Sequence, residues 1–199
     1  MSTITNFFTQ NHKVVQDPPF VHTLFADPRA GWFWLVLRVW LGYQWIDASL
    51  PKIDNPAWTQ TGLAVKGFWE NAVVIPVEGR PPIRFDWYRS FLQTLLDAEA
   101  YTWMAPLIAY GELLVGIALI VGAFTGIAAF FGGLMNWNFM MAGTVSSNPV
   151  LLIIAIGLIM AWKVAGYIGA DYFLLRWVST LWQSSSGSGE APFPAPAAK

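Results

Sequence analysis

The chain has 199 residues, of which 55% are hydrophobic and only 12% are charged, about half the charged fraction of a typical soluble domain. Its formal net charge is −1 and no run of Lys and Arg forms a phosphate-binding stripe, so we expect no nucleic-acid partner. The absence of cysteine excludes disulfides, Cys-ligated zinc and iron–sulfur clusters carried by this chain. Both histidines, His12 and His22, precede the first apolar block, and we therefore expect no haem and no metal site.

The apolar residues are gathered into four blocks of membrane-spanning length. This distribution predicts an all-α protein, a transmembrane four-helix bundle with the lipid bilayer as its solvent. The expected spans are residues 32–50, 103–121, 126–146 and 149–168. Small residues such as Gly111 and Gly116 recur along them at helix-packing intervals, which lets helices approach closely in lipid.

Three regions follow from this pattern. Residues 1–31 mix phenylalanines and prolines with polar residues, which is typical of an interfacial segment on the membrane surface and equally of a partly disordered tail. Residues 32–178 form the predicted four-helix transmembrane domain, whose first span we expect to end at the helix-stopping Pro51. The low-complexity residues 184–199 predict a disordered tail.

The first and second spans are separated by a polar stretch, residues 52–100, which predicts an extramembrane helical insert. Within it we expect a helix over residues 58–74, then a loop over residues 77–84. A second helix is expected to be N-capped by Asp86, with an apolar stripe that faces the bilayer surface or the end of the bundle.

Four spans place both chain ends on one side of the membrane. The basic residues on that side favour the cytoplasm, although the insert carries as many cations. They are Lys13, Arg29, Arg38, Lys163 and Arg176. We therefore expect a multi-pass protein of a prokaryotic plasma membrane with both termini cytoplasmic.

Polar residues inside a span are costly and are candidates for function. At about 1.5 Å of rise per residue, Gln44 and Asn138 lie roughly 18 Å from the inner face, and Glu112 roughly 16 Å. Three helices thus bring a polar group to nearly one depth. Glu112 is a candidate proton carrier, or a protonated residue that only fixes helix registry.

Two cations, Arg38 and Lys163, form a second layer roughly 9 Å from the inner face. Snorkelling to lipid phosphates explains Lys163 most simply. Arg38 fits that explanation and, as well, an ion pair with Glu112 that would create a polar pocket between helices. We take Glu112 and Arg38 as the candidate catalytic pair.

A quinone head group is the ligand that the neighbouring residues of the third span suggest. The amides of Asn136 and Asn138, with Gln44, can donate to carbonyl oxygens while Trp137 stacks on the ring, although ordinary interhelical contacts explain them as well. In and near the insert, Lys52, Arg80 and Arg84 can bind a small anion, and a solvated, charge-balanced loop is the alternative.

Specific residues add a family resemblance. The stretch Arg38 to Lys52 (RVWLGYQWIDASLPK) resembles the first-helix pattern of DoxX/DoxD-type membrane proteins, and Tyr110 to Gly132 resembles the second signature, a Glu followed by spaced glycines. The segments Asn136 to Gly143 and Asn148 to Tyr167 are similar to the large subunit of thiosulfate:quinone oxidoreductase.

This resemblance, over roughly residues 30–178, implies a four-helix membrane oxidoreductase that oxidises two thiosulfates to tetrathionate and passes the electrons to quinone as its cofactor. It also implies a second, smaller subunit, which leaves open whether the chain is an enzyme by itself. The alternative is a non-catalytic subunit that packs in a larger respiratory or photosynthetic complex. Its expected partners are the bilayer, quinone, and other membrane subunits or further copies of the chain.

Overall fold

The computed structural model describes residues 17–174, and this part of the chain is all-helical, without a strand. The all-α prediction is confirmed. The predicted disordered tail, the first sixteen residues of the predicted interfacial segment, and the cations Lys13 and Arg176 lie outside the described residues.

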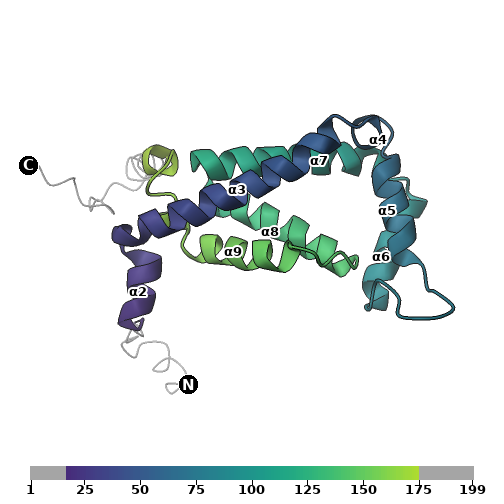
Figure 1. Ribbon diagram of the computed structural model, residues 1–199, viewed down its shortest axis with the longest axis horizontal. Helices are drawn as coiled ribbons and strands as arrows, with labels where there is room; N and C mark the ends of the chain where they lie inside the picture. The colour runs from purple at the N-terminus through teal and green to yellow at the C-terminus, as the bar shows by residue number, and fades with distance from the viewer. Residues whose placement is uncertain (1–16, 175–199) are drawn as a thin grey trace, which may run out of the picture.

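Four long helices lie side by side with similar axes (Figure 1). They are α3 (Gly31–Ile53), α7 (Tyr101–Val121), α8 (Thr125–Met141) and α9 (Asn148–Met160). A buried apolar cluster that includes Leu41, Leu119, Ala129, Ala155 and Leu158 holds them together.

Glycine allows α3 and α7 to approach closely. A Cβ atom added to Gly42 would lie 2.8 Å from the carbonyl oxygen of Gly116, and one added to Gly116 would lie 2.6 Å from Ile46. Neither position tolerates a side chain without a shift of a helix, because real Cβ atoms do not approach so near. Of the two small residues that the sequence named for helix packing, Gly116 lies at this contact, whereas a Cβ atom added to Gly111 would meet no atom within 4 Å.

Shorter helices lie at the two ends of the long ones (Figure 1). At one end α2 (Pro19–Ala26) and the 3-10 turn η1 (Pro28–Ala30) turn away from the start of α3. At the other end α4 (Pro56–Thr59), α5 (Leu63–Val73) and α6 (Asp86–Asp97) form the predicted helical insert. A further short helix, α10 (Trp162–Ala165), follows α9.

The insert packs on the bundle through its own apolar cluster. Buried side chains of α5 and α6, such as Trp69 and Leu92, contact buried residues of α7 and the end of α8, including Ala105 and Ala142. Because these contacts are apolar and extensive, the insert is fixed to one end of the bundle and helps to form the site described next.

Several local predictions are wrong. Pro51 does not stop the first helix, which continues to Ile53, because a proline in the last turn removes only one backbone hydrogen bond. The single helix expected over residues 58–74 is two helices, broken at Gly62, whose φ of +73° suits glycine. Asp86 is the first residue of α6 and not its cap; its carboxylate pairs with Arg89.

The fourth long helix is shorter than expected. α9 ends at Met160 and the chain turns into α10, whereas the sequence predicted one helix over residues 149–168. α8 likewise ends at Met141 and not at Ser146. Among the helices of residues 17–174, α7 alone is both long and apolar enough to cross a membrane, and α9 is apolar but has only 13 residues.

Candidate functional site

A buried ion pair joins the end of α3 to the middle of α7. Nζ of Lys52 lies 2.5 Å from both Oε1 and Oε2 of Glu112. The Glu112 side chain is fully buried and that of Lys52 is 20% exposed. The ammonium also lies over two aromatic rings, 5.0 Å from the centroid of Trp58 and 5.5 Å from that of Phe139. The two charges therefore neutralise each other in a water-poor, aromatic surrounding, where such pairs are strongly coupled.

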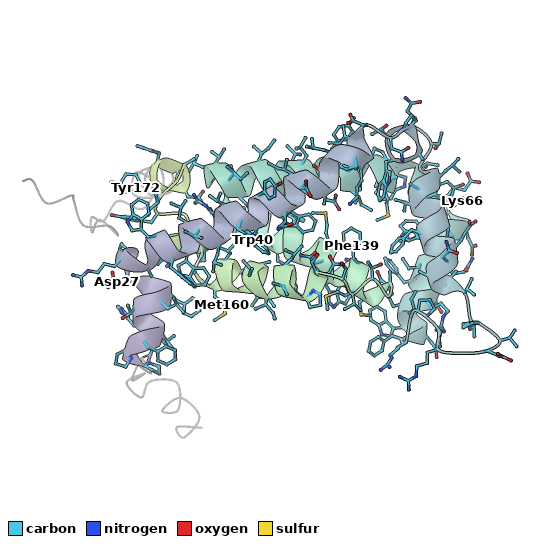
Figure 2. The ribbon with its side chains drawn as sticks, in the orientation of Figure 1. Asp27, Trp40, Lys66, Phe139, Met160 and Tyr172 are labelled. Atoms are coloured by element: carbon cyan, nitrogen blue, oxygen red, sulfur yellow. The ribbon has the colours of Figure 1, made fainter. Side chains whose placement is uncertain are left out.

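Phe139 is easily found in Figure 2, where it lies between α3 and the α8–α9 pair, toward the end that carries the insert. It belongs to α8, so the ion pair is enclosed by three of the four long helices and by α4.

More polar groups lie one to two turns further into the bundle. A Cβ atom added to Gly132 would lie 3.0 Å from Nε1 of Trp45, and the Lys52 ammonium lies over the ring of Phe139, so side chains of α3 reach α8 at two levels about two turns apart. Ser49 and Asn136 lie between these two levels, and both are fully buried. We call Trp45, Ser49, Lys52, Glu112 and Asn136 the polar layer.

Two members of the polar layer carry buried polar atoms without a partner. Within residues 17–174, neither Oδ1 nor Nδ2 of Asn136 has a hydrogen-bond partner, and neither has Nε1 of Trp45. Buried polar atoms are normally paired, since an unpaired one costs about 1–3 kcal/mol. The polar layer is therefore costly to the fold, which is common at functional sites.

An apolar cavity of about 630 Å³ adjoins the polar layer. Its walls come from the insert helices and from α7 and α8. Trp58 and Phe139, whose rings contact the Lys52 ammonium, line the cavity, and so does Gly111, the residue before Glu112 in the chain. The other lining residues are Val65, Phe68, Trp69, Tyr88, Phe91, Leu92, Leu95, Met104, Leu107, Ile108, Leu114, Val115, Phe131, Leu134, Met135, Asn138 and Ala142.

The cavity wall contains one polar pair. The Tyr88 hydroxyl lies 3.0 Å from Oδ1 of Asn138 and 3.1 Å from its carbonyl oxygen, and Nδ2 of Asn138 donates to the carbonyl oxygen of Leu134. Burial raises the pKa of Tyr88 to about 12, because the phenolate would be poorly solvated there. Tyr88 was not singled out from the sequence, where it is one tyrosine among six.

The sequence suggested an ion pair between Glu112 and Arg38, and this prediction is wrong, because Glu112 pairs with Lys52. The Arg38 guanidinium is 1% exposed, so it does not snorkel to lipid phosphates either. Nη1 donates to the carbonyl oxygen of Ala165 at 2.8 Å and Nη2 to that of Ile168 at 2.8 Å. Arg38 therefore ties α3 to the segment that follows α9, at the opposite end of α3 from Lys52.

Asp171 is the residue near Arg38 that the sequence did not reveal. Its carboxylate accepts hydrogen bonds from the backbone N–H groups of Phe124 at 2.5 Å and Thr125 at 2.8 Å, which begin α8. Asp171 is 5% exposed, and its negative charge attracts the positive guanidinium of Arg38. A lone acidic residue in an otherwise apolar stretch was the available signal. Lys163, by contrast, is exposed, and its ammonium lies 5.5 Å from the centroid of the Trp162 ring.

The proposed quinone ligands do not share one surface. Asn138 lines the cavity, whereas Asn136 belongs to the polar layer and Gln44 is half-buried on α3. Trp137 is 39% exposed and stacks on Trp87 of the insert, with ring centroids 6.4 Å apart. A two-residue step along a helix turns the side chain by roughly 200°, which explains why Asn136 and Asn138 face different sides.

The proposed anion ligands are also separated. Lys52 is engaged by Glu112, while Arg80 and Arg84 are exposed in the loop between α5 and α6. Figure 1 draws this loop at the end of α5 that lies away from α4, the helix whose Trp58 covers Lys52. The three cations therefore do not form one site.

Comparison with known proteins gives no relative: no protein-family model, no curated protein and no solved structure matches the chain.

Proposed function

We propose that the chain is an integral membrane protein, with α3, α7, α8 and α9 as a transmembrane four-helix bundle in a prokaryotic plasma membrane. The distribution of apolar surface supports this placement. The most apolar stretch of α7 is only 33% buried, whereas the core helix of a water-soluble protein is mostly buried. On α9, Val150, Ile153, Ile156 and Met160 are 48–69% exposed. Surfaces of this kind are stable in lipid and prone to aggregate in water.

The ends of the bundle support the same placement. Phe20 of α2 and Trp32 at the start of α3 are 72% and 69% exposed at one end. Trp87 and Phe91 of α6 are 59% and 47% exposed at the other. Aromatic side chains gather at both boundaries of a membrane, where one side of the ring contacts lipid and the other water. In this proposal α2 and the insert lie along opposite membrane surfaces.

Within the membrane, we infer that the chain is an oxidoreductase subunit of the type of the thiosulfate:quinone oxidoreductase large subunit, which its motifs resemble. The observation that supports this best is the buried Lys52–Glu112 ion pair between α3 and α7. Ionisable groups inside a membrane are expensive and commonly serve proton transfer. Quinone reduction requires such groups, because a quinone takes up two protons with two electrons.

The reaction balances as follows. Two thiosulfate ions lose one electron each and join through a new sulfur–sulfur bond to give tetrathionate. The quinone accepts the two electrons, and its two oxygens take two protons. Glu112 and Lys52 can exchange a proton with one another across their 2.5 Å contact, and this pair replaces Glu112–Arg38 as the proposed proton carrier. Arg80 and Arg84 remain the exposed cations available to attract the anionic donor.

The test is quinol formation by purified protein in lipid nanodiscs, supplied with thiosulfate and a short-chain quinone, with and without co-expressed partner proteins. We expect thiosulfate-dependent quinol formation that falls by about 10²–10⁴ in Glu112→Gln, the usual size of a lost acid–base contribution. The matched control is Glu78→Gln, which changes an exposed carboxylate in the insert loop and should leave the rate unchanged. Wild-type protein that leaves both substrates unreacted in every preparation would refute the activity.

A second candidate is a non-catalytic subunit of a larger membrane complex. The exposed stripe of α9 favours it, since its side chains recur every three or four residues on one face that no part of residues 17–174 covers. Such a face fits another membrane helix. Extraction in mild detergent distinguishes the two functions: this one predicts that the chain elutes with other proteins and that Glu112→Gln leaves the activity of their complex unchanged.

A further inference from the structure

The apolar cavity opens on the flank of the bundle, between α7 and α8. Four residues of these helices line the cavity and are also well exposed: Leu107 by 59%, Leu114 by 66%, Phe131 by 51% and Leu134 by 42%. Among the lining residues of the insert, Val65, Trp69 and Leu92 are deeply buried, at 1%, 5% and 2% exposed, whereas Phe91 is 47% exposed. The cavity therefore runs from an opening between α7 and α8 to a closed end at Val65, Trp69 and Leu92.

The chemistry of the wall selects what can enter. Asn138 and Tyr88 are its polar residues near the closed end, and they already hydrogen-bond each other and the backbone. The wall therefore presents few unpaired polar groups to a ligand. A polar head group placed there would lose its water and gain little in return, whereas a hydrocarbon chain would lose only contact with its solvent.

We propose that this cavity binds one hydrocarbon chain, acyl or isoprenoid, of an amphipathic membrane molecule, which enters sideways between α7 and α8 with its head group outside. The volume of about 630 Å³ lies within the range of small-molecule sites. Filled by a chain, the walls regain the dispersion contacts that an empty space of this size would forfeit. This inference rests on the membrane placement proposed above, because the opening then faces the acyl chains of the bilayer.

Gly111 offers a way to close the cavity without disturbing the fold. It lines the cavity, and a Cβ atom added there would meet no atom within 4 Å. Gly111→Leu therefore fills the space with a side chain that also favours the helix. Gly67 on α5 is the matched control, since its Cβ would equally meet nothing within 4 Å, but it does not line the cavity. Both variants make the same substitution inside a helix.

The experiment is photolabelling in lipid nanodiscs with two probes that carry a diazirine at the end of the hydrocarbon chain. One probe is a phosphatidylcholine and the other a prenylquinone. Labelled peptides are located by mass spectrometry. Labelling of α6 is counted only at Leu92, which is 2% exposed and reports the closed end of the cavity, and not at the neighbouring Phe91, which is 47% exposed. Labelling of α9 around Ile153 reports bulk lipid, because Ile153 is 69% exposed.

We expect at least one probe to label α6 in the wild type and in Gly67→Leu. In Gly111→Leu this labelling should fall at least about tenfold, because the leucine side chain displaces the end of the hydrocarbon chain and roughly ten of the dispersion contacts that it would make there. Labelling of α9 should be the same in all three proteins, which shows that each is inserted in the membrane to the same extent. The probe that labels α6 identifies the source of the chain, phospholipid or quinone.

Two results would overturn the inference: no labelling of α6 by either probe while α9 is labelled, or labelling of α6 that is unchanged in Gly111→Leu. The fate of the proposed activity is separate. If α6 is labelled in a protein without thiosulfate–quinone activity, the chain-binding cavity stands and the proposed reaction is refuted. If α6 is unlabelled in an active protein, the reaction stands and the chain-binding cavity is refuted.

Discussion

Lys52 Nζ contacts both carboxylate oxygens of Glu112 at 2.5 Å, and this contact connects the last turn of α3 to the centre of α7. The carboxylate has no exposed surface, so it depends on the ammonium for the solvation that water would otherwise supply. The ion pair therefore depends on the register of α3 against α7, because a shift of either helix would separate the two charges.

Replacing one residue of this ion pair should lower the free energy of unfolding more than replacing both residues. Lys52→Met leaves the Glu112 carboxylate buried and unpaired, and we expect the free energy of unfolding to fall by about 3–5 kcal/mol. The double variant Lys52→Met with Glu112→Leu replaces both charges with apolar groups, and it should recover most of that loss. Chemical unfolding in mixed micelles measures the cycle. Additive losses in the double variant would show that the two residues do not interact.

Gly122 should not tolerate a side chain, because the Arg38 guanidinium occupies the space beside it. A Cβ atom on Gly122 would lie 2.1 Å from Nη1 of Arg38, and Gly122 has a φ of +72°. Gly79 is the matched control, with a φ of +94° and no atom within 4 Å. We expect Gly79→Ala to cost only the backbone strain, about 1–2 kcal/mol, and Gly122→Ala to cost clearly more. Equal losses of unfolding free energy would contradict the arrangement around Arg38.

Asp171 should stabilise the start of α8. Its carboxylate accepts the N–H groups of Phe124 and Thr125, and a negative charge is favourable at a helix N-terminus. Asp171→Ala should cost about 1–2 kcal/mol, with Asp171→Asn in between because the amide keeps one acceptor. Amide hydrogen exchange in the first turn of α8 reports the loss directly. Unchanged protection of Thr125 in Asp171→Ala would contradict this role.

Tyr88 should make stability depend on alkaline pH. Its pKa is raised from 10.0 to about 12, so the folded state holds the phenol proton more tightly than the unfolded state. Its contribution is complete below pH 10 and is lost as the pH rises through about 12. Ultraviolet titration of wild type minus Tyr88→Phe should isolate one tyrosinate that appears near pH 12. A difference curve centred at pH 10 would show that the Tyr88 phenol is solvated.

The helices were largely predictable, because apolar blocks and polar breaks mark them in the sequence. The span expected over residues 103–121 is α7, Tyr101–Val121, and the insert is helical as expected. Local breaks were harder. The end of α9 at Met160 follows from how residues 161–171 fold back onto Arg38 and the α7–α8 turn, a long-range contact that no local pattern contains.

The site was only partly predictable. Counting residues placed Gln44, Glu112 and Asn138 at one depth, but α8 meets α3 with Gly132 beside Trp45 and Phe139 beside Lys52, so Asn138 lies about two turns from Gln44. The register and the rotation of a helix depend on packing, which residue counting does not contain. Lys52 was placed outside the first span, yet α3 continues past Pro51 and carries its side chain back to Glu112. For the same reason, Asn136 and not Asn138 lies in the polar layer.

The membrane placement carries the other proposals, and the cysteine-free sequence makes it directly measurable. Single cysteines can be introduced by His22→Cys in α2, Val77→Cys in the insert loop and Ile153→Cys on α9, all at exposed positions. A membrane-impermeant maleimide is then added to intact spheroplasts, before and after permeabilisation.

We predict that Val77→Cys is labelled from outside, that His22→Cys is labelled only after permeabilisation, and that Ile153→Cys is labelled in neither case because acyl chains cover it. Labelling of positions 22 and 77 from the same side, or ready labelling of position 153, would contradict a bundle that crosses the membrane.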